Sequence, residues 1–190
     1  KPRCNLAKID KNNSYTLFVL SKDYESIVSQ MANGKWQIVR ADIRWHTLEE
    51  QIKFPSILNK ENLDLVHFPY FSVPIFYNKP FVITIHDLII HHFPTGKAST
   101  LPLPLYALKI LSYKYIIKKA AQKAKKIITV SNATKEEIVD HLGVDKDKVV
   151  VTYEGVDTKI SNQCKNPKYK ILNTKYFLSV GNAYPHKNIE

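Results

Sequence analysis

Residues 124–157 read AKKIITVSNATKEEIVDHLGVDKDKVVVTYEGVD, and this stretch decides the predicted fold class. Two short apolar runs, 126–130 and 149–153, flank a segment with helical spacing. The apolar residues are continuous rather than alternating, which is typical of strands buried on both faces. The stretch therefore predicts a strand, a helix and a second strand that is parallel to the first.

The helix in this unit has recognisable ends. Ser131 can cap its start, and Thr134 with Glu137 offers a second start of the capping-box type. Gly143 stands where the helix should end. A helix over 132–142 is expected.

The same alternation extends through the rest of the chain. Further apolar runs that predict strands are 15–20, 37–39, 63–68, 81–85 and 176–180. Segments between them that predict helices are 23–32, 47–58 and 105–124. Strands alternating with crossover helices predict an α/β fold with a doubly wound, mostly parallel, Rossmann-like sheet.

Composition narrows the classes of protein and partner. Of 190 residues, 44% are hydrophobic, which is enough for a packed core, and the net charge is +11. That excess favours an anionic partner such as a phosphate ester, an acidic lipid surface or nucleic acid, unless the protein surface is simply rich in lysine. The sequence has only two cysteines, far apart, and no apolar run near the roughly 20 residues of a membrane span. A cytoplasmic location is therefore expected, which includes the inner face of the membrane.

Polar side chains follow the predicted strands where a ligand site is expected. In open α/β sheets, ligands bind beyond the carboxyl ends of the strands. His67 closes the third strong strand, and His86 with Asp87 follows the next. Ser131 and Glu154 follow the last two strands of the domain. These five residues are the first candidates for a cleft.

Three segments, in order, carry a resemblance to a known family. They are TIHDL at 84–88, the stretch 124–157, and YFLSVGNAYPHKNIE at 176–190. Together they resemble the large family of retaining glycosyltransferases with the two-domain GT-B fold, which includes many bacterial mannosyl- and glucosyltransferases. The resemblance covers roughly residues 60–190. It implies that this chain is the acceptor-side half of such an enzyme.

The resemblance gives roles to the residues that match the family pattern. His86 corresponds to the histidine beside the transferred sugar, where an imidazole can donate to a hydroxyl or share a proton. Asp87 is expected to hold the turn or orient His86. Lys187 corresponds to the lysine that grips the donor diphosphate, with Asn188 beginning a helix whose dipole faces the same anion. Gly181 lets the backbone approach the nucleotide, although Asn182 stands where many members carry arginine.

The resemblance also implies domain limits and ligands. The acceptor domain is expected over 1–157, a linker over 158–175 and the start of the donor domain over 176–190. A Gly-rich first loop and a later glutamate pair are missing, so the fold is expected to be truncated at both ends. The expected substrates are a nucleoside diphosphate sugar and a saccharide or lipid-linked acceptor, with no cofactor and no metal.

Residues 109–126 carry seven lysines and no acidic residue. Lys114, Lys118 and Lys126 are expected to share one face of an amphipathic helix. In the resembling family the acceptor domain often docks on a membrane, so this face is a candidate for an anionic lipid surface. The alternative is an ordinary crossover helix with a solvated lysine face.

Rival classes make predictions that the sequence does not meet. A dinucleotide-binding oxidoreductase needs a Gly-x-Gly-x-x-Gly turn after an early strand, and none occurs. A nucleic-acid-binding module should interleave arginine and aromatic residues with its lysines, so no nucleic-acid partner is expected. A Rossmann nucleotide-binding domain of another enzyme class and a basic module that binds anionic surfaces without catalysis stay as the alternatives.

Overall fold

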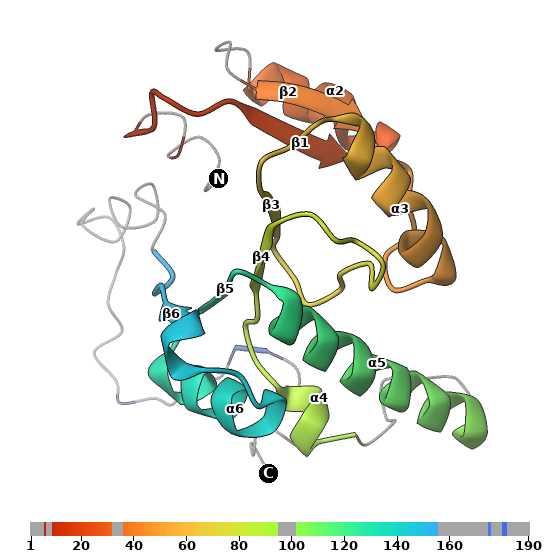
Figure 1. Cartoon of the computed structure of the whole chain (residues 1–190), viewed down its shortest axis with the longest axis vertical. Coiled ribbons are helices and arrows are strands. Elements are labelled where there is room, and N and C mark those ends of the chain that lie inside the picture. The colour runs from red at the N-terminus through yellow and green to blue at the C-terminus, as the bar shows by residue number, and fades with distance from the viewer. Residues whose placement is uncertain are drawn as a thin grey trace. The chain divides into compact units, whose positions relative to one another are not determined.

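The computed structural model describes residues 6, 9–31, 36–94, 102–155, 175, 180 and 181. The chain divides into two compact units (Figure 1). One comprises residues 1–64 and 72–79, and the other comprises 65–71 and 80–190. Residues 72–79 therefore belong to the first unit, although residues 65–71 just before them belong to the second.

The first unit contains two parallel strands and two helices. Strands β1 (Tyr15–Val19) and β2 (Trp36–Arg40) pair in register, and helix α2 (Ser21–Gln30) connects them and contacts β2. Helix α3 (Leu48–Lys60) follows, with Thr47 as its cap. The apolar residues buried in this unit include Val19, Ala41, Ile43, Phe54, Leu58, Val73 and Tyr77.

The second unit contains a four-stranded parallel sheet. Its strands are β3 (Val66–Phe68), β4 (Phe81–Thr84), β5 (Lys126–Thr129) and β6 (Val149–Val151), hydrogen-bonded in that order. Ile83 pairs with Ile127, which pairs in turn with Val149. All three side chains are buried, as expected for strands covered on both faces. The prediction of an α/β fold with parallel strands is confirmed, and the described strands form two hydrogen-bonded sheets.

Helices α4 (Ile89–His92), α5 (Leu103–Lys123) and α6 (Asn132–Leu142) and the short 3-10 helix η1 (Lys146–Lys148) complete the second unit. Helix α6 contacts β5, β6 and α5, and buries Ile138 and Leu142. No helix in the described part of the chain combines the length and apolar character needed to cross a bilayer.

The ends of α6 agree with the sequence prediction. The Ser131 hydroxyl accepts a hydrogen bond from the backbone N–H of Thr134 at 3.1 Å, so the first of the two predicted starts is used. Gly143 ends the helix with φ of 64°, a left-handed conformation that costs glycine little.

Other expectations were wrong or cannot be compared. The prediction that Lys126 shares a helix face with Lys114 and Lys118 was wrong, because α5 ends at Lys123 and Lys126 is the first residue of β5. Helices α4 and η1 were not predicted. The predicted strand 176–180 and most of the linker 158–175 lie outside the described residues.

Candidate active site at the carboxyl ends of β4, β5 and β6

Three neighbouring strands end together at one edge of the four-stranded sheet. Past their last paired residues, the Ile85 N–H donates to the Ile128 carbonyl at 2.9 Å, and the Thr152 N–H donates to the Thr129 carbonyl at 2.8 Å. These bonds keep the strand exits aligned. The side chains that follow are therefore held near one another at the edge where ligands bind in parallel sheets.

His86 and Glu154 meet at this edge. The His86 Nδ1 lies 3.7 Å from a Glu154 carboxylate oxygen, although the two residues leave the sheet from β4 and β6, with β5 between them. The side chains are 43% and 75% exposed. A contact between side chains so exposed contributes no more than about 1 kcal/mol to stability, and both groups are accessible to solvent or to a ligand.

Ser131 and Thr134 connect the start of α6 to the His86 backbone. The Thr134 hydroxyl lies 2.9 Å from the Ser131 hydroxyl and donates to the His86 carbonyl at 3.4 Å. Thr134 is buried. Ser131 is thus a helix cap, and its partner Thr134 helps to fix the His86 backbone.

Asp87 holds the turn after β4. Its carboxylate accepts a hydrogen bond from the Ile89 N–H at 3.1 Å, at the start of α4. This is the turn-holding role expected for Asp87. Burial raises the pKa of Tyr70 and Tyr113, and the Asp87 carboxylate adds to both shifts.

His67 is hydrogen-bonded to the neighbouring strand of the same sheet. It is the middle residue of β3, not its last, and its Nε2 lies 2.8 Å from the hydroxyl of Thr84 on β4. Burial lowers the pKa of His67, which favours the neutral imidazole. The hydrogen bond between His67 and Thr84 therefore links β3 to β4.

Two residues of the edge were not singled out from the sequence. The Asn132 side-chain amide donates to the Tyr153 hydroxyl at 3.2 Å, which links the first residue of α6 to the exit of β6. Both directly adjoin candidates: Asn132 follows Ser131, and Tyr153 precedes Glu154. Both would have been candidates if the rule that ligands bind beyond the carboxyl ends of strands had been applied to one more residue on either side.

Three histidines gather where α4 meets α5 and α6. The His91 Nδ1 lies 3.1 Å from the Tyr113 hydroxyl, and the His92 Nε2 lies 3.5 Å from a carboxylate oxygen of Glu137. The ring centroids of His92 and His141 are 5.0 Å apart. Burial, with Lys114 and the neighbouring histidines, lowers the pKa of His91. Within the described ranges, no group of three or more His, Cys, Asp or Glu side chains could hold a metal ion.

The residues that the sequence predicts to bind the donor are only partly described by the structure. Gly181 is exposed and has φ of 146°, a conformation that L side chains rarely adopt. Its predicted role of letting a nucleotide approach the backbone stays a prediction. Lys187 and Asn188 lie outside the described residues.

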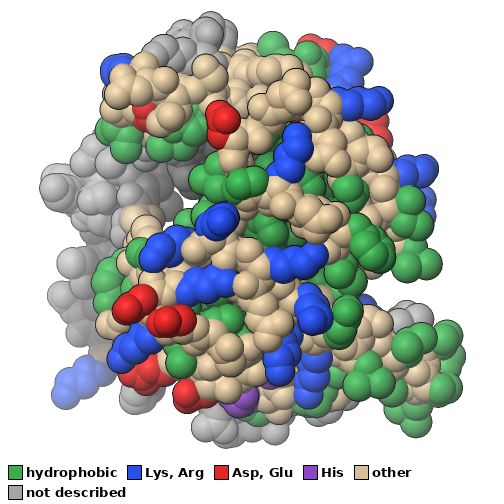
Figure 2. Space-filling model, in the orientation of Figure 1, with side chains coloured by type: hydrophobic (Ala, Val, Ile, Leu, Met, Phe, Trp, Pro, Cys, Tyr) green, Lys and Arg blue, Asp and Glu red, His purple; other side chains and the backbone are tan. Residues whose placement is uncertain are grey.

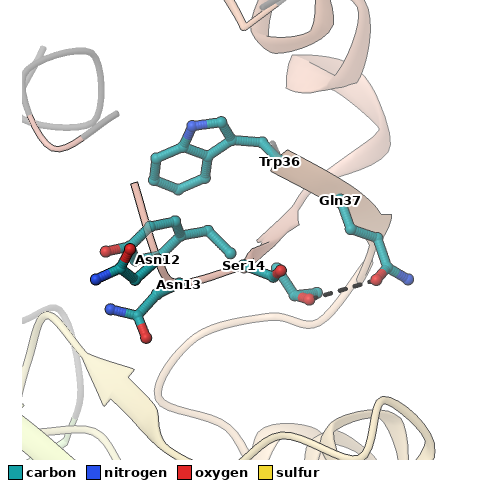
Figure 3. A pocket seen from close by; sticks show the side chains of 7 residues that line it. Asn12, Asn13, Ser14, Trp36 and Gln37 are labelled. Atoms are coloured by element: carbon teal, nitrogen blue, oxygen red, sulfur yellow. Dashed lines mark hydrogen bonds between the residues drawn. The ribbon is translucent and has the colours of Figure 1, made fainter. Parts of the chain in front are cut away.

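A separate hollow of about 480 Å³ occurs in the first unit (Figure 3). It lies where β1 and β2 begin, and its lining residues are Asn12, Asn13, Ser14, Tyr15, Thr16, Trp36 and Gln37. The Tyr15 and Trp36 rings stack on each other with centroids 4.6 Å apart. This is the amino end of a parallel sheet, opposite to the edge that serves ligands in such folds. No predicted site residue lies there.

The chain belongs to Glycosyltransferase Family 4, whose sequence profile matches residues 27–160. The match includes every residue of the edge described above. A curated relative is the O-antigen chain mannosyltransferase RfbU of Salmonella typhimurium, 28% identical over 145 residues. The aligned segment covers 76% of this chain and 36% of that relative, so the chain spans about a third of the relative's length.

Proposed function

We propose that this chain is the acceptor-side part of a retaining glycosyltransferase that moves a hexose from a nucleoside diphosphate sugar to a saccharide or lipid-linked acceptor. Membership of Glycosyltransferase Family 4 supports the class of reaction. The similarity to a mannosyltransferase supports a hexose donor and a glycan acceptor.

The observation that carries the proposal is the pairing of His86 with Glu154 at the carboxyl edge of the sheet. An imidazole and a carboxylate, both open to solvent, can bind sugar hydroxyls and exchange protons near neutral pH. The neighbouring Thr134 and Asp87 hold the backbone on either side of His86 without covering its ring.

Transfer breaks the bond between the anomeric carbon and the diphosphate. A new bond forms on the same face of the sugar to an acceptor hydroxyl, whose proton leaves with the diphosphate. His86 is assigned to the sugar at the reaction centre. By the family resemblance, Lys187 and the helix that Asn188 begins are assigned to the growing negative charge of the diphosphate, and Gly181 to its approach.

Sugar transfer by the full-length protein tests the proposal. We expect one of GDP-mannose, UDP-glucose and UDP-galactose to release its nucleoside diphosphate faster when octyl α-D-mannopyranoside is added as the acceptor probe. NMR of the product should show a new glycosidic linkage with the donor's anomeric configuration. An inverted product would contradict retention, and no turnover of any of these donors would contradict the proposed activity.

A second element of the proposal is an anionic membrane surface as partner, at the cytoplasmic face. Helix α5 contains no acidic residue, and Lys114 and Lys118 are exposed on it. Large apolar side chains on the same helix are also exposed: Leu103, Leu105, Leu108, Leu111 and Tyr115. Figure 2 shows apolar side chains gathered toward the amino-terminal end of α5, with basic side chains following along it. Apolar and basic side chains together favour a lipid surface over a purely polar partner.

The corrected position of Lys126 changes which lysines belong to this surface. The Lys126 ammonium donates to the Asp147 carbonyl at 2.8 Å and so fastens β5 to η1. Lys114 and Lys118 stay as the lysines proposed to face lipid.

The double variant Lys114→Gln with Lys118→Gln should bind anionic vesicles about 30-fold more weakly, because each lysine near an anionic surface contributes about 1 kcal/mol. The measurement is co-sedimentation with vesicles of phosphatidylcholine and phosphatidylglycerol.

The matched control, Lys22→Gln with Lys60→Gln, removes the same charge from exposed positions on α2 and α3. It should bind like the wild type. Equal losses in both double variants would show that only net charge matters and would remove α5 as the docking surface.

A further inference from the structure

Tyr153 presents an aromatic ring at the proposed active-site edge. It lies two residues past the end of β6 and directly precedes Glu154, and 69% of its surface is exposed. The buried apolar residues of this unit include Ile83, Ile127 and Val149 on the strands, and Tyr153 is not among them. The Tyr153 ring therefore contributes little to the core, while it stands beside the groups assigned to sugar chemistry.

Asn132 holds this ring in place from a different element. Its side-chain amide donates to the Tyr153 hydroxyl at 3.2 Å, across 21 residues of sequence. The Tyr153 hydroxyl keeps its own proton to donate, and the Asn132 amide oxygen can still accept. An exposed aromatic residue whose polar end is tethered loses less conformational freedom when it binds a ligand.

The position of the ring relative to the proposed reaction centre follows from strand order. Tyr153 and Glu154 leave β6, α6 begins after β5, and His86 follows β4. Glu154 contacts His86, so the adjacent Tyr153 lies at the flank of this pair on the β6 side. A sugar bound over Tyr153 would offer its hydroxyls toward Glu154 and His86.

We infer that Tyr153 and Asn132 form a saccharide subsite that binds the acceptor of the reaction proposed above. The C–H face of a pyranose carries partial positive charge and packs on the negative face of an aromatic ring. The Asn132 amide and the Tyr153 hydroxyl, with the Glu154 carboxylate on the next residue, supply donors and acceptors of the kind that sugar hydroxyls need. The inference rests on the proposed function only in naming this saccharide as the acceptor.

Saccharide binding to the full-length protein tests the subsite separately from transfer. In saturation-transfer NMR with methyl α-D-mannopyranoside and methyl α-D-glucopyranoside, at least one probe should receive saturation mainly on the ring protons of one face. Tyr153→Ala should weaken that binding, and raise KM for the octyl α-D-mannopyranoside acceptor, by about tenfold. Tyr153→Phe keeps the ring and should stay within about threefold of the wild type. KM for the donor should not change in either variant.

Phe76→Ala is the matched control, because Phe76 is a 75% exposed aromatic residue of the loop 72–79, which belongs to the first unit. It should bind the probe like the wild type. If the wild type transfers sugar and Tyr153→Ala keeps the wild-type acceptor KM, the subsite is overturned and the proposed function stands. If no donor is turned over but Tyr153→Ala loses saccharide binding, the subsite stands and the proposed function fails. A parallel rise in donor KM with a lower melting temperature would show that Tyr153 is only structural and would overturn the inference.

Discussion

Replacing His86 by alanine in the full-length protein is expected to lower kcat/KM for sugar transfer by about 100- to 1,000-fold. The imidazole lies at the exit of β4, in contact with Glu154 and assigned to the reaction centre. Its loss removes a hydrogen-bonding group whose position is already fixed by the surrounding backbone. Initial rates with the donor that the wild type uses give the measurement.

The fold should survive this substitution. The His86 side chain is 43% exposed, and its Nδ1 lies 3.7 Å from the even more exposed carboxylate of Glu154. The bond from Thr134 goes to the His86 backbone carbonyl, which alanine keeps. Circular dichroism and the melting temperature should therefore match the wild type, and His86→Asn provides a polar replacement should the alanine variant lose stability.

His141→Ala is the control for histidine loss in the same unit. His141 is exposed on α6 and packs near His92. Its removal should leave transfer within about twofold of the wild type, since surface substitutions away from a site have small effects. Unchanged turnover in His86→Ala would end the assignment of His86 to the reaction centre.

The strands and α6 could be predicted because their signals are local. Each buried strand is a short apolar run, and Ser131 and Gly143 mark the ends of α6 through contacts within a few residues. Helix α4 has four residues and is stabilised by the Asp87 turn and by His91 on Tyr113, which lies 22 residues away. Contacts of that kind leave no periodic pattern in the sequence.

The boundary between α5 and β5 shows how a periodic signal misleads. Lysines at helical spacing continue past the point where the backbone changes. At Ala124 the backbone becomes extended, with φ of −55° and ψ of 144°, and Lys126 enters the sheet beside Val82. Ile127 is buried in the parallel sheet, and this tertiary packing outweighs the helix propensity of the lysines that precede it.

The edge itself was partly predictable. His86 and Glu154 were each selected because they follow a predicted strand. Their contact depends on the order of β4, β5 and β6 in the sheet, which the sequence of any one strand does not determine. His67 was selected as a strand end, whereas β3 continues to Phe68. Its exposed side chain is hydrogen-bonded to Thr84 and so links β3 to β4.

The second large effect is expected at Glu50, a fully buried residue of α3 in the first unit. Its carboxyl group accepts hydrogen bonds from the His46 N–H at 2.8 Å and from the Ser72 hydroxyl at 2.6 Å. These bonds connect the start of α3 to the loop 72–79. Glu50→Ala leaves both donors without this acceptor and opens a cavity, so we expect a loss of about 3 kcal/mol in the free energy of unfolding.

Urea unfolding of the 190-residue chain, followed by tryptophan emission, measures this loss in the relevant unit. The only two tryptophans in the sequence, Trp36 and Trp45, both belong to the first unit, and Trp45 packs edge-on against Phe54 of α3. Glu50→Gln retains a carbonyl acceptor of the same shape and should lose only about 1 kcal/mol.

Glu49→Ala is the matched control, since it removes a carboxylate one residue earlier on the same helix. Glu49 pairs with Lys53 at 2.8 Å on the surface, a pair of a kind that contributes less than about 1 kcal/mol. The loss in the free energy of unfolding should be largest for Glu50→Ala, smaller for Glu50→Gln and smallest for Glu49→Ala. That order would show that the hydrogen-bond acceptor for His46 and Ser72, rather than negative charge on α3, holds the loop 72–79. Equal losses for Glu50→Ala and Glu49→Ala would contradict that account, because the two residues share a helix and a charge but not these hydrogen bonds.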